Sequence, residues 1–312
     1  ALTAGFIPSY IDVVLNFGNQ VLMNDNIIFQ INALQKDIIF YGDDTWVKLF
    51  PNLFKRYEGT TSFYVTDFYE VDLNVTRNMK KELHNNDWTV MILHYLGLDH
   101  IGHVEGPQGK HINSKLEEMD KVIEYIYENF IRRKSDVHNS NILIITGDHG
   151  MRDSGGHGGS SRAETHVPLI FIGDVCANKK FKLEDIQQID LPPTLSILMG
   201  TPIPLGSIGA VIDSVISNLP SKQKIYGLYY NTMHLATHCK EHIDNVQNYE
   251  YFKDYLKALN LYKDWILTNY TDSNLEKQSS TLFITSMKQM SKELSLLGTN
   301  YNTFYLLISI IL

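Results

Sequence analysis

One stretch decides the fold: Asn141-Ile142-Leu143-Ile144-Ile145-Thr146-Gly147-Asp148-His149-Gly150. The β-branched apolar run at its start is typical of a strand buried inside a sheet. In an open α/β sheet, ligands and catalytic groups gather just beyond the carboxyl ends of such strands. Asp148 and His149 stand at that place, and a carboxylate and an imidazole are ordinary zinc ligands. Alone, this pair is explained equally well as a polar turn.

A second constellation repeats the same arrangement upstream. The apolar run 90–96 reads as another strand, and Gly97, Asp99 and His103 follow it. A third motif, Gly155-Gly156-His157-Gly158-Gly159, is a loop whose glycines permit close backbone approach. Each acid or histidine, taken singly, is also compatible with a solvated loop position. Because all three motifs lie at or shortly after strand ends, we predict that five residues form most of two neighbouring metal sites: Asp99, His103, Asp148, His149 and His157.

Two other polar clusters carry a weaker indication of metal binding. Asp43-Asp44 follows a predicted strand at 37–41, where acids more often serve as turn residues or helix caps. His234, His238 and His242 recur every four residues and would share one face of a helix. A metal patch there is conceivable, but no strand end or glycine loop accompanies it. We therefore interpret both clusters without a metal.

The remaining pattern alternates strands with helices. Apolar residues at three- and four-residue intervals over 114–133 predict an amphipathic helix lying on a sheet. Pro168 suits a position near the start of a predicted strand at 167–172, or a strand at the sheet edge. Pro192 and Pro193 suit the first turn of a helix that ends near Gly200. Residues 222–298 read as two or three helices. The fold class predicted is α/β, a mostly parallel sheet with helices on both faces, followed by a helical segment.

Composition narrows the class of partner. The chain of 312 residues has 44% hydrophobic residues, enough for a large core. A formal charge of −8 provides no basic field for a phosphate backbone, so we expect no nucleic-acid partner. Cys176 and Cys239 could form one bridge or stay reduced, and the sequence leaves this open. The sequons at Asn74 and Asn269 suggest glycosylation and a luminal or extracellular location.

The chain ends in an apolar run at 304–312. A membrane-spanning helix needs about 20 such residues, so the run is too short by itself. Because it stops abruptly at the last residue, we expect it to be the start of a truncated transmembrane helix, with a buried terminal strand or helix as the alternative.

Four blocks of this sequence resemble the alkaline phosphatase superfamily, and more narrowly the ethanolamine phosphate transferases of glycosylphosphatidylinositol (GPI) anchor synthesis. The resemblance spans roughly residues 1–213 and is specific to this group. Among these transferases, the blocks are most similar to the second type, which modifies the second mannose. The third type is the close rival. The blocks are 93–103 with Gly106-Pro107, 147–151 with 156–159, 188–195 with 200–204, and 42–46 with 49–51.

The resemblance implies a ligand set for two Zn²⁺ ions. Asp99, His103 and His157 correspond to the ligands of one zinc, and Asp148 and His149 to ligands of the other. The family completes the second site with an Asp and a nucleophilic Thr, which we expect upstream of Ala1. Thr3 is not a substitute, because it lies in the stretch that resembles the helix after the nucleophile. We therefore expect an incomplete and inactive catalytic domain.

The function implied is transfer of phosphoethanolamine from phosphatidylethanolamine to a mannose of the GPI precursor. The zinc-activated Thr would attack the donor, diacylglycerol would leave, and a mannose hydroxyl would accept the group. The resemblance also implies an endoplasmic reticulum membrane location with a luminal catalytic domain, and a small membrane subunit. Two alternatives are a two-zinc phosphodiesterase or pyrophosphatase, and a non-catalytic fragment. The expected domains are 1–215 (catalytic, incomplete), 216–303 (helical extension) and 304–312 (start of a membrane helix).

Overall fold

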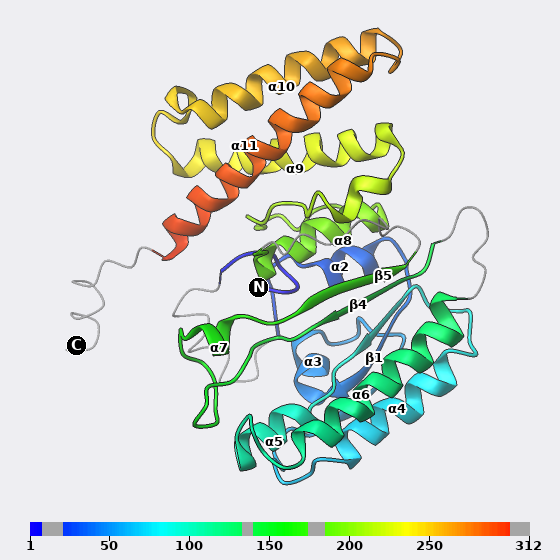
Figure 1. The fold of residues 1–312 in the computed structure, drawn as a ribbon. Helices are drawn as coiled ribbons and strands as arrows, with labels where there is room; N and C mark the ends of the chain where they lie inside the picture. Colours follow the sequence, from blue (N-terminus) through cyan, green and yellow to red (C-terminus); the bar gives the residue numbers. More distant parts are fainter. Residues whose placement is uncertain (8–20, 133–139, 174–184, 300–312) are drawn as a thin grey trace, which may run out of the picture. The chain divides into compact units, whose positions relative to one another are not determined.

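The computed structural model describes residues 1–7, 21–132, 140–173 and 185–299 (Figure 1). The chain divides into two compact units. The first, called here the α/β unit, consists of Asn16–Met23 and Ile31–Cys176. The second, the helical unit, consists of Ala1–Leu15, Asn24–Gln30 and Ala177–Leu312. The helix α2 (Ile27–Ala33) contains residues of both units.

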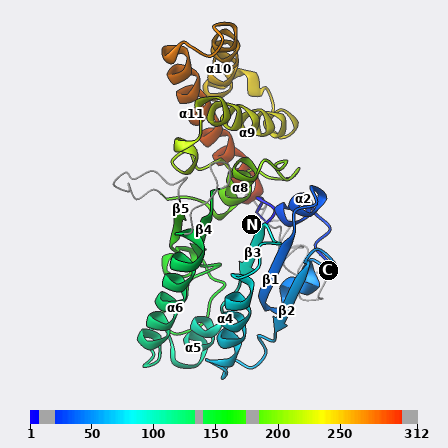
Figure 2. The ribbon, with the colours of Figure 1, turned by 90° about the vertical axis from the view of Figure 1, so that its right-hand side faces the viewer.

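The α/β unit is built on a parallel sheet. Its central strand β1 (Ile38–Asp43) pairs in parallel with β2 (Arg56–Thr60) on one side and β3 (Val90–Leu93) on the other (Figure 2). Residues 38–41 are buried, as a central strand covered on both faces requires. The strand predicted at 37–41 is therefore confirmed.

A second sheet pairs β4 (Ile142–Thr146) with β5 (Leu169–Gly173). This pair is antiparallel, with Ile142 opposite Gly173 and Thr146 opposite Leu169. Pro168 immediately precedes β5, as expected of a residue that cannot donate to a ladder. The parallel arrangement predicted thus holds among β1, β2 and β3, while β5 runs against β4.

Helices cover both faces of the parallel sheet. On one face, α4 (Glu70–Glu82) packs Val75 against Ile39 and Tyr41. The helix α6 (Ile112–Ile126) joins α4 there in a cluster that also includes Leu143 of β4. On the other face, α3 (Asp44–Leu49) stacks Trp46 on Phe40, with ring centroids 5.5 Å apart. The alternation of strand side chains explains this division, because Phe40 points opposite to its neighbours.

The helix α6 differs in detail from the amphipathic helix predicted at 114–133. It ends at Ile126 and continues as a π-helical turn, Tyr127–Ile131. Its buried residues are Lys115, Val122 and Ile126, whereas Leu116 is 49% exposed. Met119, Ile126 and Phe130 pack in the core cluster as the periodicity predicts. The buried Lys115 ammonium lies 3.1 Å from Asp72 of α4 and 2.9 Å from Glu118 of its own helix.

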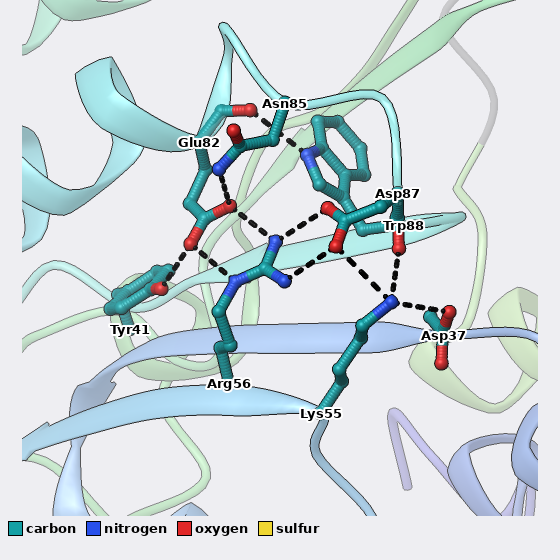
Figure 3. A network of polar contacts seen from close by, with 8 residues as sticks. All are labelled: Asp37, Tyr41, Lys55, Arg56, Glu82, Asn85, Asp87 and Trp88. Atoms are coloured by element: carbon teal, nitrogen blue, oxygen red, sulfur yellow. Dashed lines mark hydrogen bonds and ion pairs between the residues drawn. The ribbon is translucent and has the colours of Figure 1, made fainter.

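A network of ion pairs lies at the amino ends of the parallel strands (Figure 3). The guanidinium of Arg56 donates to Glu82 at 2.6 and 2.8 Å and to Asp87 at 2.8 Å. Tyr41 also donates to Glu82, at 2.7 Å. Lys55 donates to Asp37 at 2.8 Å and approaches Asp87 to 3.2 Å. The network connects the start of β2 with the residues that precede β1 and β3.

The helical unit consists mainly of four helices: α8 (Leu191–Met199), α9 (Ser221–His242), α10 (Glu250–Leu267) and α11 (Ser273–Thr299). Short 3-10 turns occur at Gln188–Asp190, Val215–Asn218 and Val246–Asn248. The three long helices enclose an apolar core that includes Leu235, Trp265 and Phe283. Pro192 and Pro193 occupy the first turn of α8, and Gly200 ends it with φ +66°, as predicted.

The predicted start of a membrane helix and the possible disulfide involve residues outside the described ranges. The apolar run 304–312 and Cys176 both lie there, while Cys239 is a buried free thiol. In the part of the chain that is described, no helix has the length and apolar character needed to cross a bilayer. The domain boundaries at 215 and 303 stay predictions.

Candidate metal centre

The helix α5 (Gly97–Glu105) carries Asp99 and His103 just beyond β3. Four residues apart on a helix, the two side chains lie on the same face. Residues at the start of α5 are held by a carboxylate of α4, because the N–H groups of Leu96 and Gly97 donate to Asp72 Oδ1 at 2.9 and 3.0 Å. A β-carbon on Gly97 would lie only 2.2 Å from Asp72 Oδ2, so glycine is required for this close approach.

Asp148 and His149 follow the carboxyl end of β4, as predicted. The N–H of His149 donates to Asp148 Oδ1 at 2.9 Å. The ring nitrogen Nδ1 of His149 lies 3.0 Å from the carbonyl oxygen of Gly150. Because a carbonyl only accepts, Nδ1 carries the proton and Nε2 keeps its lone pair for a ligand.

His157 lies in the glycine loop, which is held by a buried acid that the sequence reasoning missed. Glu164, in the short helix α7 (Arg162–Thr165), accepts from the N–H of Gly159 at 2.9 Å and from the hydroxyl of Ser161 at 2.6 Å. These two donors hold the pKa of Glu164 below its usual value. The three-residue spacing of Ser161 and Glu164, typical of a helix start, was the available signal.

A close contact joins the first two ligand loops. Gly102 lies on α5 between Asp99 and His103, and Met151 comes three residues after Asp148. A β-carbon on Gly102 would lie 2.1 Å from the Met151 sulfur. The absence of a side chain at Gly102 therefore lets the loop after β4 pack directly on α5.

The donor atoms of three predicted ligands are spaced as zinc ligands are. His103 Nε2 lies 3.1 Å from His157 Nε2 and 3.4 Å from Asp99 Oδ2. His157 Nε2 lies 3.5 Å from Asp99 Oδ1. Ligands placed tetrahedrally around zinc at their usual bond lengths are separated by about 3.3 Å. The two histidines approach different oxygens of the Asp99 carboxylate, so the pairwise spacing suits zinc ligands, while a shared ion at these three residues stays a prediction.

The other two predicted ligands lie beside this group. The His149 ring stacks on the His157 ring with centroids 3.6 Å apart. Donor atoms of Asp99, His149 and His157 all lie within 4.8 Å of one another. Asp148 Oδ2 is 3.5 Å from His149 Nε2, and the Asp148 side chain is 54% exposed. The fold brings all five residues together, while the division of the ligands between two ions stays a prediction.

The electrostatics of the cluster suit a bound cation. Burial lowers the pKa of His157, and the His149 and His103 rings lower it further against the opposing effect of Asp99. The lowered pKa favours the neutral ring, the form that binds a metal. Asp99 Oδ1 is buried, and none of the described residues donates a hydrogen bond to it. A divalent cation would satisfy this oxygen.

A buried ion pair, also missed from the sequence, lies behind the cluster. Asp72 Oδ2 is 3.1 Å from the ammonium group of Lys115, and the side chains are 1% and 2% exposed. Burial raises the pKa of Asp72, while the N–H groups of Gly97 and Leu96 and the ammonium of Lys115 oppose the shift. Because Asp72 also binds the start of α5, this pair positions the helix that carries Asp99 and His103.

The remaining predicted positions have other contacts in the structure. Asp43 caps α3 by accepting from the N–H of Thr45 at 2.9 Å, and Asp44 pairs with Lys48 at 2.8 Å. The sequon residue Asn74 lies within α4 and donates to Glu58. Asn269 is exposed in the turn after α10, with φ +55°. Glycosylation at either asparagine stays a prediction.

Comparison with known proteins identifies the class. The model of the type I phosphodiesterase / nucleotide pyrophosphatase family matches residues 40–269, which include all five clustered ligands. The chain therefore belongs to this family, a branch of the alkaline phosphatase superfamily.

More particularly, the chain is similar to GPI ethanolamine phosphate transferase 2. It is 39% identical to the catalytic subunit of that enzyme from Homo sapiens over 302 residues, 96% of this chain and 30% of the relative. The Schizosaccharomyces pombe enzyme is 41% identical over 69% of this chain and 31% of its own length. The Kluyveromyces lactis enzyme is 34% identical over 98% and 38%. The chain thus spans about a third of the length of these relatives.

Proposed function

We propose that this chain supplies the metal-binding part of an enzyme that transfers phosphoethanolamine from phosphatidylethanolamine to a mannose of the GPI precursor. The observation that carries the proposal is the convergence of Asp99, His103 and His157, with pairwise contacts of 3.1 to 3.5 Å made through both Asp99 oxygens, in a chain similar to GPI ethanolamine phosphate transferase 2. The acceptor is the second mannose, and the chemistry takes place at the luminal side of the endoplasmic reticulum membrane. A small membrane subunit assists the complete enzyme.

The residues of this chain have a defined role in that reaction. Two bound zinc ions would polarise the phosphoryl oxygens and lower the pKa of an attacking hydroxyl. Asp99, His103 and His157 would hold one ion, and Asp148 and His149 would supply part of the coordination shell of the other. The attacking hydroxyl belongs to a threonine upstream of Ala1.

A second function is supported by the family itself, whose description names phosphodiesterases and nucleotide pyrophosphatases. The same metal cluster would serve hydrolysis if water, rather than a mannose hydroxyl, accepts the phosphoryl group. The similarity to transferases over 96% of the chain favours transfer.

The test compares the two reactions in the full-length protein. Membranes containing it are supplied with ethanolamine-labelled phosphatidylethanolamine and a mannose-bearing GPI precursor, and separately with a nucleotide diester. We expect label in the GPI product, and we expect the variant His103→Ala to lose this transfer while keeping its fold.

The matched control is His84→Ala, which removes an exposed histidine from the turn after α4. This variant should transfer label like the wild type. Full transfer by the His103→Ala enzyme would refute the ligand assignment, and hydrolysis of the diester without transfer would favour the second function.

A further inference from the structure

A second cluster of histidines lies in the helical unit, on the last turns of α9. His234, His238 and His242 follow one another at four-residue intervals, so their rings form a row on one face. The His234 and His238 rings meet edge to face with centroids 4.8 Å apart, and the His238 and His242 rings are nearly parallel at 6.3 Å. The transferase reaction proposed above uses none of these residues.

Three side chains of this row offer metal ligands close to one another. A ring nitrogen of His238, a ring nitrogen of His242 and a carboxylate oxygen of Glu241 all lie within 4.8 Å of one another. Two imidazoles and a carboxylate form a ligand set typical of Zn²⁺ and similar divalent transition metals. Because Glu241 and His242 are exposed, small side-chain rotations bring the donors to the about 3.3 Å spacing of a tetrahedral site.

The His238 ring is already oriented by the backbone. Its Nε2 lies 2.9 Å from the carbonyl oxygen of Leu205, so this nitrogen carries the proton and Nδ1 keeps its lone pair. Histidines that bind metals usually donate their other ring N–H to such a carbonyl. His234 makes the same contact one turn earlier, with Nε2 2.8 Å from the carbonyl oxygen of Ser207.

The loop that supplies these carbonyl groups is itself held in place. The N–H of Leu205 donates to Asp25 Oδ2 at 2.8 Å, and the N–H of Ile208 donates to the carbonyl oxygen of Gly5 at 2.8 Å. Ser207 is fully buried. A fixed loop therefore orients His238 before any metal arrives, which reduces the entropy lost on binding.

The local charge also favours a cation. His242 is the last residue of α9, so the cluster lies at the negative end of the dipole of a 22-residue helix. Among the residues that the structure describes, no lysine or arginine forms an ion pair with Glu241, and the neighbouring Lys240 instead lies over the Phe252 ring at 5.7 Å. The carboxylate of Glu241 is thus available to a metal ion.

We propose that His238, Glu241 and His242 form a second metal site, which binds one divalent transition-metal ion of the zinc class with water completing its shell. The site is independent of the Asp99 cluster and does not rest on the proposed transferase function. Through His238, the bound ion links the end of α9 to the loop at Leu205.

The test measures Zn²⁺ binding by equilibrium dialysis in a background with Asp99→Ala and His157→Ala, which disables the other cluster. In this background we expect one equivalent of Zn²⁺ per chain, and we expect His242→Ala to remove it. Glu241→Gln should weaken binding at least about tenfold, because it removes the charged ligand. Cobalt bound to the background chain should give a visible absorption band that His242→Ala abolishes.

Two controls make the result decisive. His84→Ala removes an exposed histidine elsewhere and should leave the equivalent of zinc in place. Circular dichroism of the metal-free variants should match that of the background chain, since Glu241 and His242 are exposed. No zinc bound in the background chain, or equal binding with and without both His242 and Glu241, would overturn the proposal.

Discussion

The two ends of the strands in the α/β unit use charged side chains in opposite ways. At the amino ends, Arg56 and Lys55 pair with Glu82, Asp87 and Asp37, so that each charge has a partner of opposite sign (Figure 3). At the carboxyl ends, Asp99 and several histidines crowd together, and Asp99 Oδ1 has no hydrogen-bond donor among the described residues. The first end satisfies its own charges, whereas the second leaves a buried carboxylate oxygen without a hydrogen-bond donor among the described residues, as a cation site would.

The difference separates side chains that stabilise the fold from side chains whose arrangement suits a bound ligand. Removing one partner of a charge pair within the protein destabilises the fold whether or not a ligand is present. Ligands held close together without a cation contribute little to folding but reduce the reorganisation needed when a metal binds. The two ends should therefore respond differently to substitution, and four predictions test this.

The largest effect is expected from His157→Ala. Removing one zinc ligand should weaken Zn²⁺ binding on the order of 1,000-fold, since about 10–16 kcal/mol of binding free energy is shared among the ligands of such a site. The free energy of unfolding of the metal-free chain should change by less than about 0.5 kcal/mol, because the side chain is 31% exposed. Zinc titration and denaturation with a chelator present measure the two quantities. Marked destabilisation without metal would assign His157 a structural role.

The next effect is expected from Lys115→Met, which leaves the buried Asp72 carboxylate without its cation. The free energy of unfolding should fall by about 3 kcal/mol, as when one partner of a buried ion pair is removed. Zinc affinity should also fall, by roughly tenfold, because Asp72 holds the start of α5.

The double variant Asp72→Asn/Lys115→Met provides the control for this pair. The asparagine oxygen can still accept from Leu96 and Gly97, and no buried charge remains unpaired. Both stability and zinc affinity should recover most of their loss. If the double variant loses as much zinc affinity as the single variant, the pair does not position α5.

A smaller effect is expected from Arg56→Met at the amino end. The free energy of unfolding should fall by about 2 kcal/mol, between the values for exposed and buried pairs, since Glu82 is buried but Arg56 is 32% exposed. Zinc affinity should stay within twofold of the wild type. Urea denaturation and zinc titration check both expectations, and a large loss of zinc affinity would contradict the separation of the two ends.

The smallest effect is a pH dependence from Glu82. Hydrogen bonds from Arg56, Asn85 and Tyr41 lower the pKa of Glu82 to about 2 from its ordinary 4.5. The unfolded state therefore takes up a proton first as the pH falls, and the contribution of Glu82 to stability, complete above pH 5, is lost between about 4.5 and 2. The difference in unfolding free energy between the wild type and Glu82→Gln should shrink over that range. A constant difference would contradict the depressed pKa.

The sequence by itself predicted which residues cluster at the carboxyl ends of the strands. The strand at 37–41, the two acid–histidine motifs and the glycine loop at His157 were all predicted, and the structure brings their five ligands together. Such features are local: a β-branched run predicts a buried strand, and the residues after it follow at the same end of the sheet. The antiparallel direction of β5 carries no comparable local signal, because pairing direction depends on the strand that lies beside it.

Only the tertiary structure decided how the ligands are held. No sequence signal marks Lys115 as buried, yet its side chain is 2% exposed and its ammonium lies 3.1 Å from Asp72 of another helix. Met151 and Gly102 pack together although 49 positions separate them in the sequence. Leu205 orients His238 across a loop. These contacts join residues that are distant in sequence, so their free energies arise only once the chain has folded, and no periodicity or motif records them.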